Sequence, residues 1–273
     1  MSIKTLVINP GSTSTKVGVF EDETLLFEET LRHPTEEIAK YASVIDQKDF
    51  RKAIILDFLK EKNCAPESLN VIVGRGGLLK PIPGGTYAVS DALLADLKAG
   101  VQGQHASNLG GILAYELAQR LGIPAYIYDA VSVSETKPLA CLTGVKGLAR
   151  QSRLHALNIR ATAIAQAGKL GKPLDSMNLL VAHLGGGVTM AMVEKGRMTD
   201  ILLDGEGPMS PERAGRCPLS SLITYCIANQ IDYKMLMKRI RGVAAHPFPQ
   251  RRGKVPGLRG MGADRVGKQR VAD

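Results

Sequence analysis

The sequence has few of the features that mark membrane and secreted proteins. It contains no tryptophan, its aromatic residues make up only 4% of the chain, and no apolar run approaches the roughly 20 residues of a membrane-spanning helix. The apolar stretch near the N-terminus is too short, and turns polar too soon, for a secretory signal. These absences predict a cytoplasmic protein with no membrane partner.

Cysteine is also scarce, and the four cysteines lie far apart at Cys64, Cys141, Cys217 and Cys226. They form no Cys-x-x-Cys pair and have no neighbouring histidines at the spacing of metal ligands. We therefore expect reduced thiols that mostly serve as packing residues.

Acidic residues are too few to balance the basic ones, and the formal net charge is +9. The segment 241–273 holds eight Lys or Arg against two Asp or Glu, so most of this excess lies there. The preceding part of the chain shows no basic stripe, and aromatic residues are rare. A nucleic-acid partner is therefore not expected, and any binding of that kind would belong to the basic segment alone.

With 273 residues, 44% of them hydrophobic, the chain is long enough for two domains. Its first apolar runs predict strands over residues 6–8, 16–20 and 25–27, joined by a loop of small residues and a polar turn. The same plan returns about 174 residues later, with strands over 179–183 and 188–193. Such an internal repeat indicates two related α/β domains that face each other.

Helical signals lie between the two copies. Phe50, Ile54 and Phe58 share one helical face, Ser90 is placed to cap a helix over 91–99, and Ser107 opens a segment that Gly122 closes. Extended segments at 70–73 and 124–128 alternate with them, which predicts mixed sheets with helices on their faces. We expect domains at 1–155 and 156–240, followed by an irregular basic tail at 241–273.

Two loops have the composition of a phosphate cradle. In the first, residues 9–16, small side chains let backbone N–H groups approach an anion, Ser and Thr add hydroxyl donors, and Lys16 adds a charge. The second runs from His183 to Gly187 and contains three consecutive glycines. Each alone can be an ordinary turn or flexible hairpin, but their matching places in a repeat suggest one nucleotide phosphate chain held from two domains.

Other candidate residues follow strand ends or lie in glycine-rich loops, where open α/β sheets bind ligands. They are Arg75, His105, Asp129 and Arg213, to which His155 adds a side chain in an expected helix near the domain boundary. For each of them the alternative is a solvated charge or an ordinary structural residue.

The motifs at 7–16, 74–77, 103–108 and 183–187 stand together in an order that resembles the butyrate kinase branch of the acetate kinase family. The run 204–213 resembles that branch more than the acetate kinases. The resemblance extends to about Ile240. It implies a two-domain actin-like (ribonuclease H-like) α/β fold with duplicated mixed sheets flanked by helices, the second domain being incomplete.

The resemblance also implies a function, which is phosphoryl transfer between ATP and a short-chain fatty acid to give its acyl phosphate and ADP, with Mg²⁺ as cofactor and at least a homodimer as the assembly. Asn9 would help to place the metal, and Arg75 with His105 would bind the acid. The catalytic group would be Arg75, Asp129, His155 and Arg213. The residues implied to hold the ATP phosphates are Gly11, Ser12, Thr13, Lys16, His183, Gly185, Gly186 and Gly187.

The sequence departs from the family pattern at several points. Leu154 stands before the key histidine where an aromatic residue is usual, and no adenosine-binding segment or returning helix is recognisable after Ile240. We therefore expect impaired catalysis, and expect 241–273 not to continue the fold. The alternative function is a truncated relic that binds nucleotide without turnover.

Overall fold

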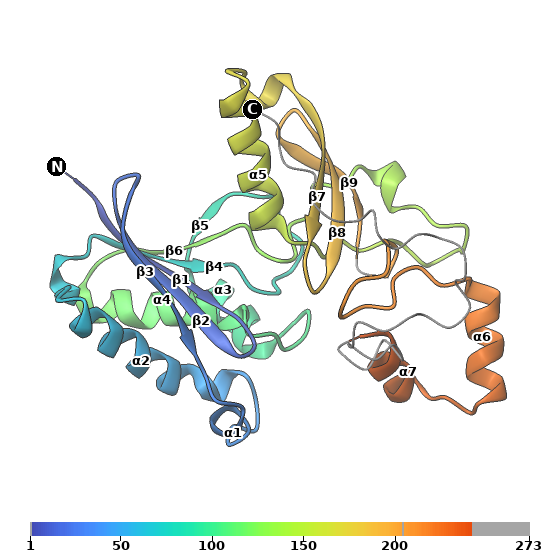
Figure 1. Ribbon diagram of the computed structural model, residues 1–273, viewed down its shortest axis with the longest axis horizontal. Helices are drawn as coiled ribbons and strands as arrows, with labels where there is room; N and C mark the ends of the chain where they lie inside the picture. Colours follow the sequence, from blue (N-terminus) through green and yellow to red (C-terminus); the bar gives the residue numbers. More distant parts are fainter. Residues whose placement is uncertain (1, 204, 242–273) are drawn as a thin grey trace, which may run out of the picture.

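The computed structural model describes residues 2–203 and 205–241 of the chain. The irregular basic tail predicted for 241–273 lies outside these residues except for Arg241. The structure contains two sheets, one of six strands and one of three, with helices packed around them (Figure 1).

The larger sheet has the strand order β3-β2-β1-β4-β6-β5. Strands β1 (Lys4–Pro10), β2 (Ser14–Glu21) and β3 (Thr24–Arg32) form an antiparallel meander, as the alternating apolar residues predict. Strands β4 (Val71–Arg75) and β6 (Ala125–Tyr128) lie parallel to β1, and β5 (Thr86–Ala88) closes the edge antiparallel to β6. The parallel strands bring Arg75 and the residues after Tyr128 to the same edge of the sheet.

Two long helices cover one face of this sheet. They are α2 (Lys48–Glu61) and α4 (Asn108–Leu121), and their apolar residues form one core with β1, β2 and β4. Helix α3 (Asp91–Ala99) begins at Ser90, whose hydroxyl accepts a hydrogen bond from the Leu93 amide, and ends at Gly100 in the left-handed conformation (φ 64°). These three helices were predicted from their spacing and caps.

The smaller sheet repeats the meander of the first. Strands β7 (Asn178–Leu184), β8 (Val188–Glu194) and β9 (Arg197–Leu202) pair antiparallel, and in both copies a three-residue loop, 11–13 or 185–187, joins the first two strands. Asn9 pairs with Lys16 in the first copy, and His183 pairs with Thr189 in the second. The repeat inferred from the sequence is therefore present in the structure.

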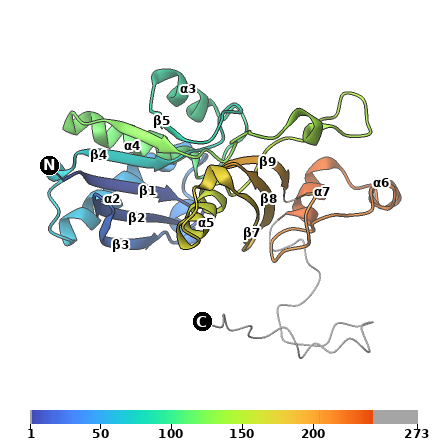
Figure 2. The same ribbon diagram turned by 90° about the horizontal axis from the view of Figure 1, so that it is seen from above.

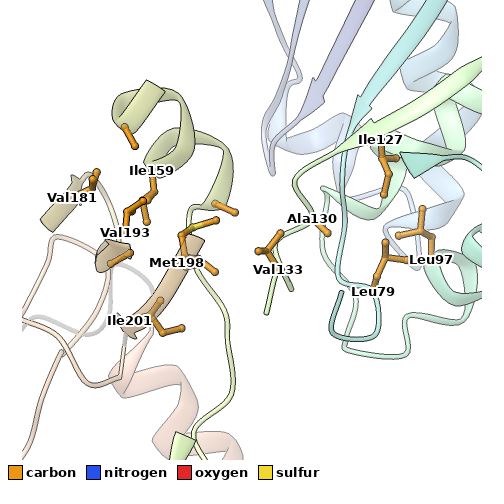
Figure 3. Close-up of a cluster of buried hydrophobic side chains, with 14 of the residues drawn as sticks. Leu79, Leu97, Ile127, Ala130, Val133, Ile159, Val181, Val193, Met198 and Ile201 are labelled. Atoms are coloured by element: carbon orange, nitrogen blue, oxygen red, sulfur yellow. The ribbon is translucent and has the colours of Figure 1, made fainter. Parts of the chain in front are cut away.

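Helix α5 (Ala156–Lys169) packs on the smaller sheet and follows the segment that connects the two halves. A single cluster of buried side chains includes residues from both halves. Figure 3 shows the cluster as two groups of side chains. In the group that contains Ile127, Ala130 and Val133 lie on the side that faces Ile159 and Met198 in the other group. The predicted boundary at residue 155 lies just before α5, and the division into domains stays a prediction.

Helices α6 (Leu219–Ala228) and α7 (Tyr233–Ile240) lie beyond the smaller sheet, at the end of the molecule opposite the larger one (Figure 2). Within residues 2–203 and 205–241, every helix is too short or too polar to cross a bilayer. The remaining elements are short helices: α1 (Thr35–Ile38) and the 3₁₀ turns Ile45–Gln47, Pro66–Ser68, Pro138–Cys141 and Leu174–Ser176.

Candidate active site

Five of the predicted site residues line one cavity of about 310 Å³ that is formed by both halves of the chain. They are Arg75, His105, His155, Gly187 and Arg213. Arg75 comes from the end of β4, His105 from the loop before α4, and Gly187 from the β7–β8 loop. The structure thus brings together candidates that are up to 138 positions apart in the sequence.

Arg75 is half-buried at this cavity, and burial lowers the pKa of its guanidinium. Among the described residues, no carboxylate forms an ion pair with it. The flanking glycines have a packing role: a Cβ at Gly74 would lie 2.1 Å from the Gly110 carbonyl oxygen, and one at Gly76 would lie 2.6 Å from the Ala130 Cα. Close approach of the backbone therefore fixes where the guanidinium emerges.

His105 is held in one tautomer by the turn that precedes α4. The Ser107 amide donates to its Nδ1 at 3.1 Å, and the Ser107 hydroxyl lies 2.7 Å from the same nitrogen. Because a backbone amide can only donate, Nδ1 is the acceptor and a neutral His105 carries its proton on Nε2. Burial, followed by the charges of Arg75 and Arg213, lowers the pKa of His105, so the ring is a neutral N–H donor beside two cations.

His155 and His183 stack face to face, with ring centroids 3.9 Å apart and an interplanar angle of 12°. His155 Nδ1 lies 3.0 Å from the Thr189 hydroxyl, and His183 Nδ1 lies 2.9 Å from Asn158 Oδ1. Burial and the charge of Arg75 lower the pKa of His183. The sequence had suggested that His155 lies within a helix, but it occupies the N-cap position of α5, where its backbone (φ −83°, ψ 60°) is not helical.

The β7–β8 loop positions the segment that carries Arg213. The Gly186 carbonyl oxygen accepts hydrogen bonds from the Glu212 amide at 2.9 Å and from the Ser210 hydroxyl at 2.7 Å. A Cβ at Gly186 would lie 2.7 Å from the Glu212 carboxylate. Arg213 donates to the Glu212 carbonyl oxygen and lies 3.7 Å from the Glu212 carboxylate. The glycines therefore allow this segment to lie against the loop.

Asp129 is not among the residues that line the cavity. Its carboxylate is fully buried, receives a 2.6 Å hydrogen bond from Arg160 Nε, and accepts another from the Gly85 amide at 2.9 Å. Arg160 also contacts Glu135 and the Gly196 carbonyl oxygen in the β8–β9 turn. Asp129 thus belongs to an ion-pair network that connects the end of β6 to the smaller sheet.

The first predicted phosphate loop, Gly11, Ser12 and Thr13, lies between β1 and β2 and is also outside the cavity lining. Lys16 is half-exposed on β2 and forms a 3.0 Å ion pair with Glu28 on β3. Asn9 occupies the matching position on β1. Among the described residues, no group of three or more His, Cys, Asp or Glu side chains could hold a metal ion.

His33 is buried beside this hairpin, with Nε2 2.9 Å from the Thr15 hydroxyl. Burial and the nearby Arg51 lower its pKa to about 4, from 6.5 for an ordinary histidine. Between these two values the unfolded chain binds more protons than the folded chain, so the free energy of unfolding falls as the pH is lowered through this window. We expect a loss of about 2 kcal/mol between pH 7 and pH 5.

Urea titrations from pH 4 to pH 8 measure this effect. The variant His33→Gln keeps a polar side chain but does not titrate, so its profile should be flatter over the same window. A variant profile as steep as that of the wild type would assign the pH dependence to other groups.

The cavity also contains residues that sequence reasoning did not single out. Arg153 and Thr189 are polar members of its wall, and Leu78 and Val131 are apolar ones; Leu154, noted in the sequence for its departure from the family pattern, also lines it. Arg153 precedes the Leu154-His155 pair in the sequence and lies beside the helix that was expected around His155. Thr189 pairs with His183 across the second hairpin. Because this hairpin was predicted from the sequence, its register could have placed Thr189 near the site.

A larger hollow of about 660 Å³ lies on the smaller sheet between Glu135 and Thr199. None of the predicted site residues line it, and two of its charged residues, Lys137 and Glu194, already pair with each other. The cavity around Arg75 is therefore the better candidate for a site of anion chemistry.

Comparison with known sequences gives close relatives, although no family model matches the chain. It is 52% identical over 239 residues to butyrate kinase 1 of Clostridium acetobutylicum, and the aligned region covers 87% of this chain and 67% of the relative. It is 51% identical over 244 residues to a probable butyrate kinase of Clostridium botulinum, with coverages of 89% and 69%. The chain thus spans about two thirds of the length of these relatives.

Comparison with solved structures gives the same fold at much lower identity. The acetate kinase of Porphyromonas gingivalis superposes with a TM-score of 0.69 at 17% identity, covering 88% of this chain and 68% of that one. A propionate kinase from Francisella tularensis gives a TM-score of 0.64 at 15% identity, with the same coverages. The actin-like α/β fold expected from the sequence is therefore confirmed.

Proposed function

The chain belongs to the butyrate kinase family, and from this premise we propose that it transfers a phosphoryl group between ATP and a short-chain carboxylate. The observation that carries the proposal is the unpaired Arg75 guanidinium in a cavity that it shares with Arg213, His105 and His155. Several donors and cations converge there, and no carboxylate among the described residues pairs with Arg75. Such a site suits two anions that must be brought together.

The proposed reaction needs no strong base, because a carboxylate is already ionised and nucleophilic at neutral pH. One of its oxygens forms a bond to the γ-phosphorus of ATP, the bond from that phosphorus to the β–γ bridging oxygen breaks, and ADP leaves with the electron pair. No proton has to be moved in this step. Catalysis then consists of alignment and neutralisation of charge during in-line transfer.

Arg75 is proposed to bind the acceptor carboxylate, since a planar guanidinium matches two carboxylate oxygens. Arg213, which lines the same cavity, is proposed to contact the phosphoryl group in flight. The fixed tautomer of His105 supplies a neutral N–H donor, and His155 supplies a further ring nitrogen next to Gly187. These groups are held before the substrates bind, so little reorganisation accompanies the reaction.

The ATP phosphates are proposed to contact the two hairpin loops, 11–13 and 185–187, together with Lys16 and His183. Mg²⁺ would be bound together with the nucleotide phosphates, where a protein group would contact it mainly through its bound water. Asn9, a neutral amide at the end of β1, fits a contact to such a water, and Mg²⁺ supplies charge neutralisation when it is bound. Asp129 is proposed to act through Arg160, by keeping the edge of the larger sheet aligned with the smaller sheet.

The acid is proposed to place its alkyl chain against Leu78, Val131 and Leu154, the apolar part of the wall that also contains Arg75. Leu154 is smaller than the aromatic residue usual at this position, which leaves room for a four-carbon or branched chain. We further propose that the protein is cytoplasmic and forms a homodimer or a higher homo-oligomer. Light scattering on the purified chain tests the assembly.

Leu154→Phe should reduce the space for the alkyl chain. We expect the KM for isobutyrate to rise about fivefold, corresponding to roughly 1 kcal/mol, while the KM for acetate changes little. Initial rates with both acids measure the ratio, and Leu139→Phe, at an exposed position of the 3₁₀ turn Pro138–Cys141, is the matched control. Equal changes for the two acids would place the alkyl chain elsewhere.

A coupled ADP-release assay with butyrate, isobutyrate, propionate and acetate tests the proposed function as a whole. We expect turnover with at least one of the four-carbon acids. Calorimetric ATP binding without acyl phosphate formation from any acid would favour the alternative, a nucleotide-binding chain that does not catalyse transfer.

A further inference from the structure

Arg51, on α2, is a large charged side chain that the proposed mechanism does not use, and it is only 1% exposed. A buried guanidinium normally has a carboxylate partner, because removing an unpaired charge from water is costly. Among the described residues, Arg51 forms no ion pair, and burial lowers its pKa to about 10. Its hydrogen bonds go to the Thr15 hydroxyl, the Gln47 amide oxygen and backbone carbonyl oxygens.

Those carbonyl oxygens belong to the first hairpin loop. Arg51 Nη1 donates to the oxygens of Gly11 at 2.9 Å and Ser14 at 3.1 Å, and Nη2 donates to the oxygen of Ser12 at 3.2 Å. The remaining carbonyl, that of Thr13, accepts from the His33 amide at 2.9 Å. All four carbonyl groups of 11–14 therefore accept hydrogen bonds, either from the Arg51 guanidinium or from the backbone.

This arrangement determines the direction of the loop amides. In a trans peptide the C=O and the following N–H point in opposite directions. With the Gly11 and Ser12 carbonyls directed at Arg51, the N–H groups of Ser12 and Thr13 point away from it. Within the described part of the chain, neither amide has a hydrogen-bond acceptor. Two unused donors on one side of a loop, with a cation beneath it, form a site for an anion.

We propose that Arg51 is a positioning residue for nucleotide phosphate: it fixes the Gly11–Ser14 loop with its amides outward, and its charge is compensated when a phosphate binds above them. The inference rests on the proposed function, because it takes the anion to be a phosphate of ATP or ADP. The inference makes Arg51 a determinant of nucleotide affinity, although this residue of α2 does not line the cavity.

The test compares two substitutions at neighbouring positions of α2. Arg51→Met removes the charge and the hydrogen bonds but keeps much of the volume. Lys52→Met is the matched control, because Lys52 is also buried and cationic but pairs with Asp49 at 2.7 Å and Glu116 at 2.5 Å, away from the loop. Both variants should unfold more easily than the wild type, so stability alone does not distinguish them.

Nucleotide affinity does distinguish them. For folded Arg51→Met we expect the calorimetric Kd for ADP–Mg²⁺ to rise about tenfold or more, because the loop amides would no longer be held in position. The Kd of Arg51→Lys should lie between those of the wild type and Arg51→Met. The Kd of Lys52→Met and the KM for the acid in both variants should stay within about twofold of the wild type. An unchanged Kd in Arg51→Met, or an equal rise in Lys52→Met, would overturn the inference while the proposed function stands.

A measurement on the wild type covers the case in which Arg51→Met does not fold. In an ADP–Mg²⁺ titration followed by ¹⁵N NMR, the Ser12 and Thr13 amides should be among the most strongly shifted resonances. Binding of nucleotide without a shift at these amides would overturn the inference alone. A wild-type chain that binds no nucleotide would overturn both the inference and the proposed function.

Discussion

Arg213→Ala should lower kcat about 100-fold or more and leave the KM for the acid and for ATP within a few-fold of the wild type. Arg213 lines the cavity from a segment that hydrogen-bonds to the β7–β8 loop, and its charge acts on His105 together with that of Arg75. The contact between Arg213 and the phosphoryl group is expected to strengthen only when negative charge shifts between the reacting groups. Arg213 should therefore stabilise the transition state and contribute little to substrate binding.

Steady-state kinetics with both substrates varied measure this effect. Arg216→Ala is the matched control, since Arg216 lies three residues further along the same segment and does not line the cavity. A change in KM without loss of kcat would reassign Arg213 to ground-state binding. A comparable loss in Arg216→Ala would indicate that the segment as a whole had been disturbed.

Arg75→Ala should act on the acid instead. We expect the KM for the carboxylate to rise about 100-fold, roughly the effect of removing one partner of a buried charge pair, and the KM for ATP to change several-fold less. The physical reason is the position of Arg75 at the end of β4, half-buried beside the apolar residues proposed to contact the alkyl chain. Arg75→Lys keeps the charge but loses the planar fork, so it should recover only part of the affinity.

Arg32→Ala, an exposed position on β3, is the control for general effects of losing a basic residue. Equal increases in the KM values for acid and ATP in Arg75→Ala would remove the assignment of Arg75 to the acceptor side. Full activity of Arg75→Ala would remove Arg75 from the site.

Much of the fold could be predicted from the sequence because its signals are local. Alternating apolar residues marked both hairpins, and the Ser90 and Gly100 caps gave the bounds of α3. The elements that were missed had weak local signals. Strand β5 has only three residues, and β9 follows a turn after which no further strand was expected. Their pairing with longer neighbours holds them in the sheets.

The site was predictable only in part because its groups depend on contacts that the sequence does not display. Arg75, His105, His155, Gly187 and Arg213, which the sequence motifs grouped, line one cavity in the structure, and their roles stay predictions. Helix α2 shows this limit: Phe50, Ile54 and Phe58 were expected on one face, but of these only Phe58 is buried. The other buried residues of the helix are Arg51, Lys52, Ile55 and Leu59. An arginine can take a core position there only because loop carbonyls 37 to 40 positions away satisfy it.

Asp129 illustrates the same limit. Its place after β6 suggested a residue at the ligand, yet its carboxylate is satisfied by Arg160 and the Gly85 amide. Position at a strand end predicts nearness to a site, but the partners of a side chain determine whether it faces the ligand. For Asp129 these partners are 31 and 44 positions away.

The central claim is that the cavity around Arg75 and Arg213 transfers phosphoryl groups to a short-chain acid, and trapping of the acyl phosphate tests it most directly. The 273-residue chain is incubated with ATP–Mg²⁺, butyrate or isobutyrate, and hydroxylamine, long enough to detect slow turnover. The account predicts acyl hydroxamate with at least one of these acids and at least about a 100-fold lower rate for Arg213→Ala under the same conditions. No hydroxamate above the level of that variant, from a folded wild-type chain that binds ATP, would contradict it.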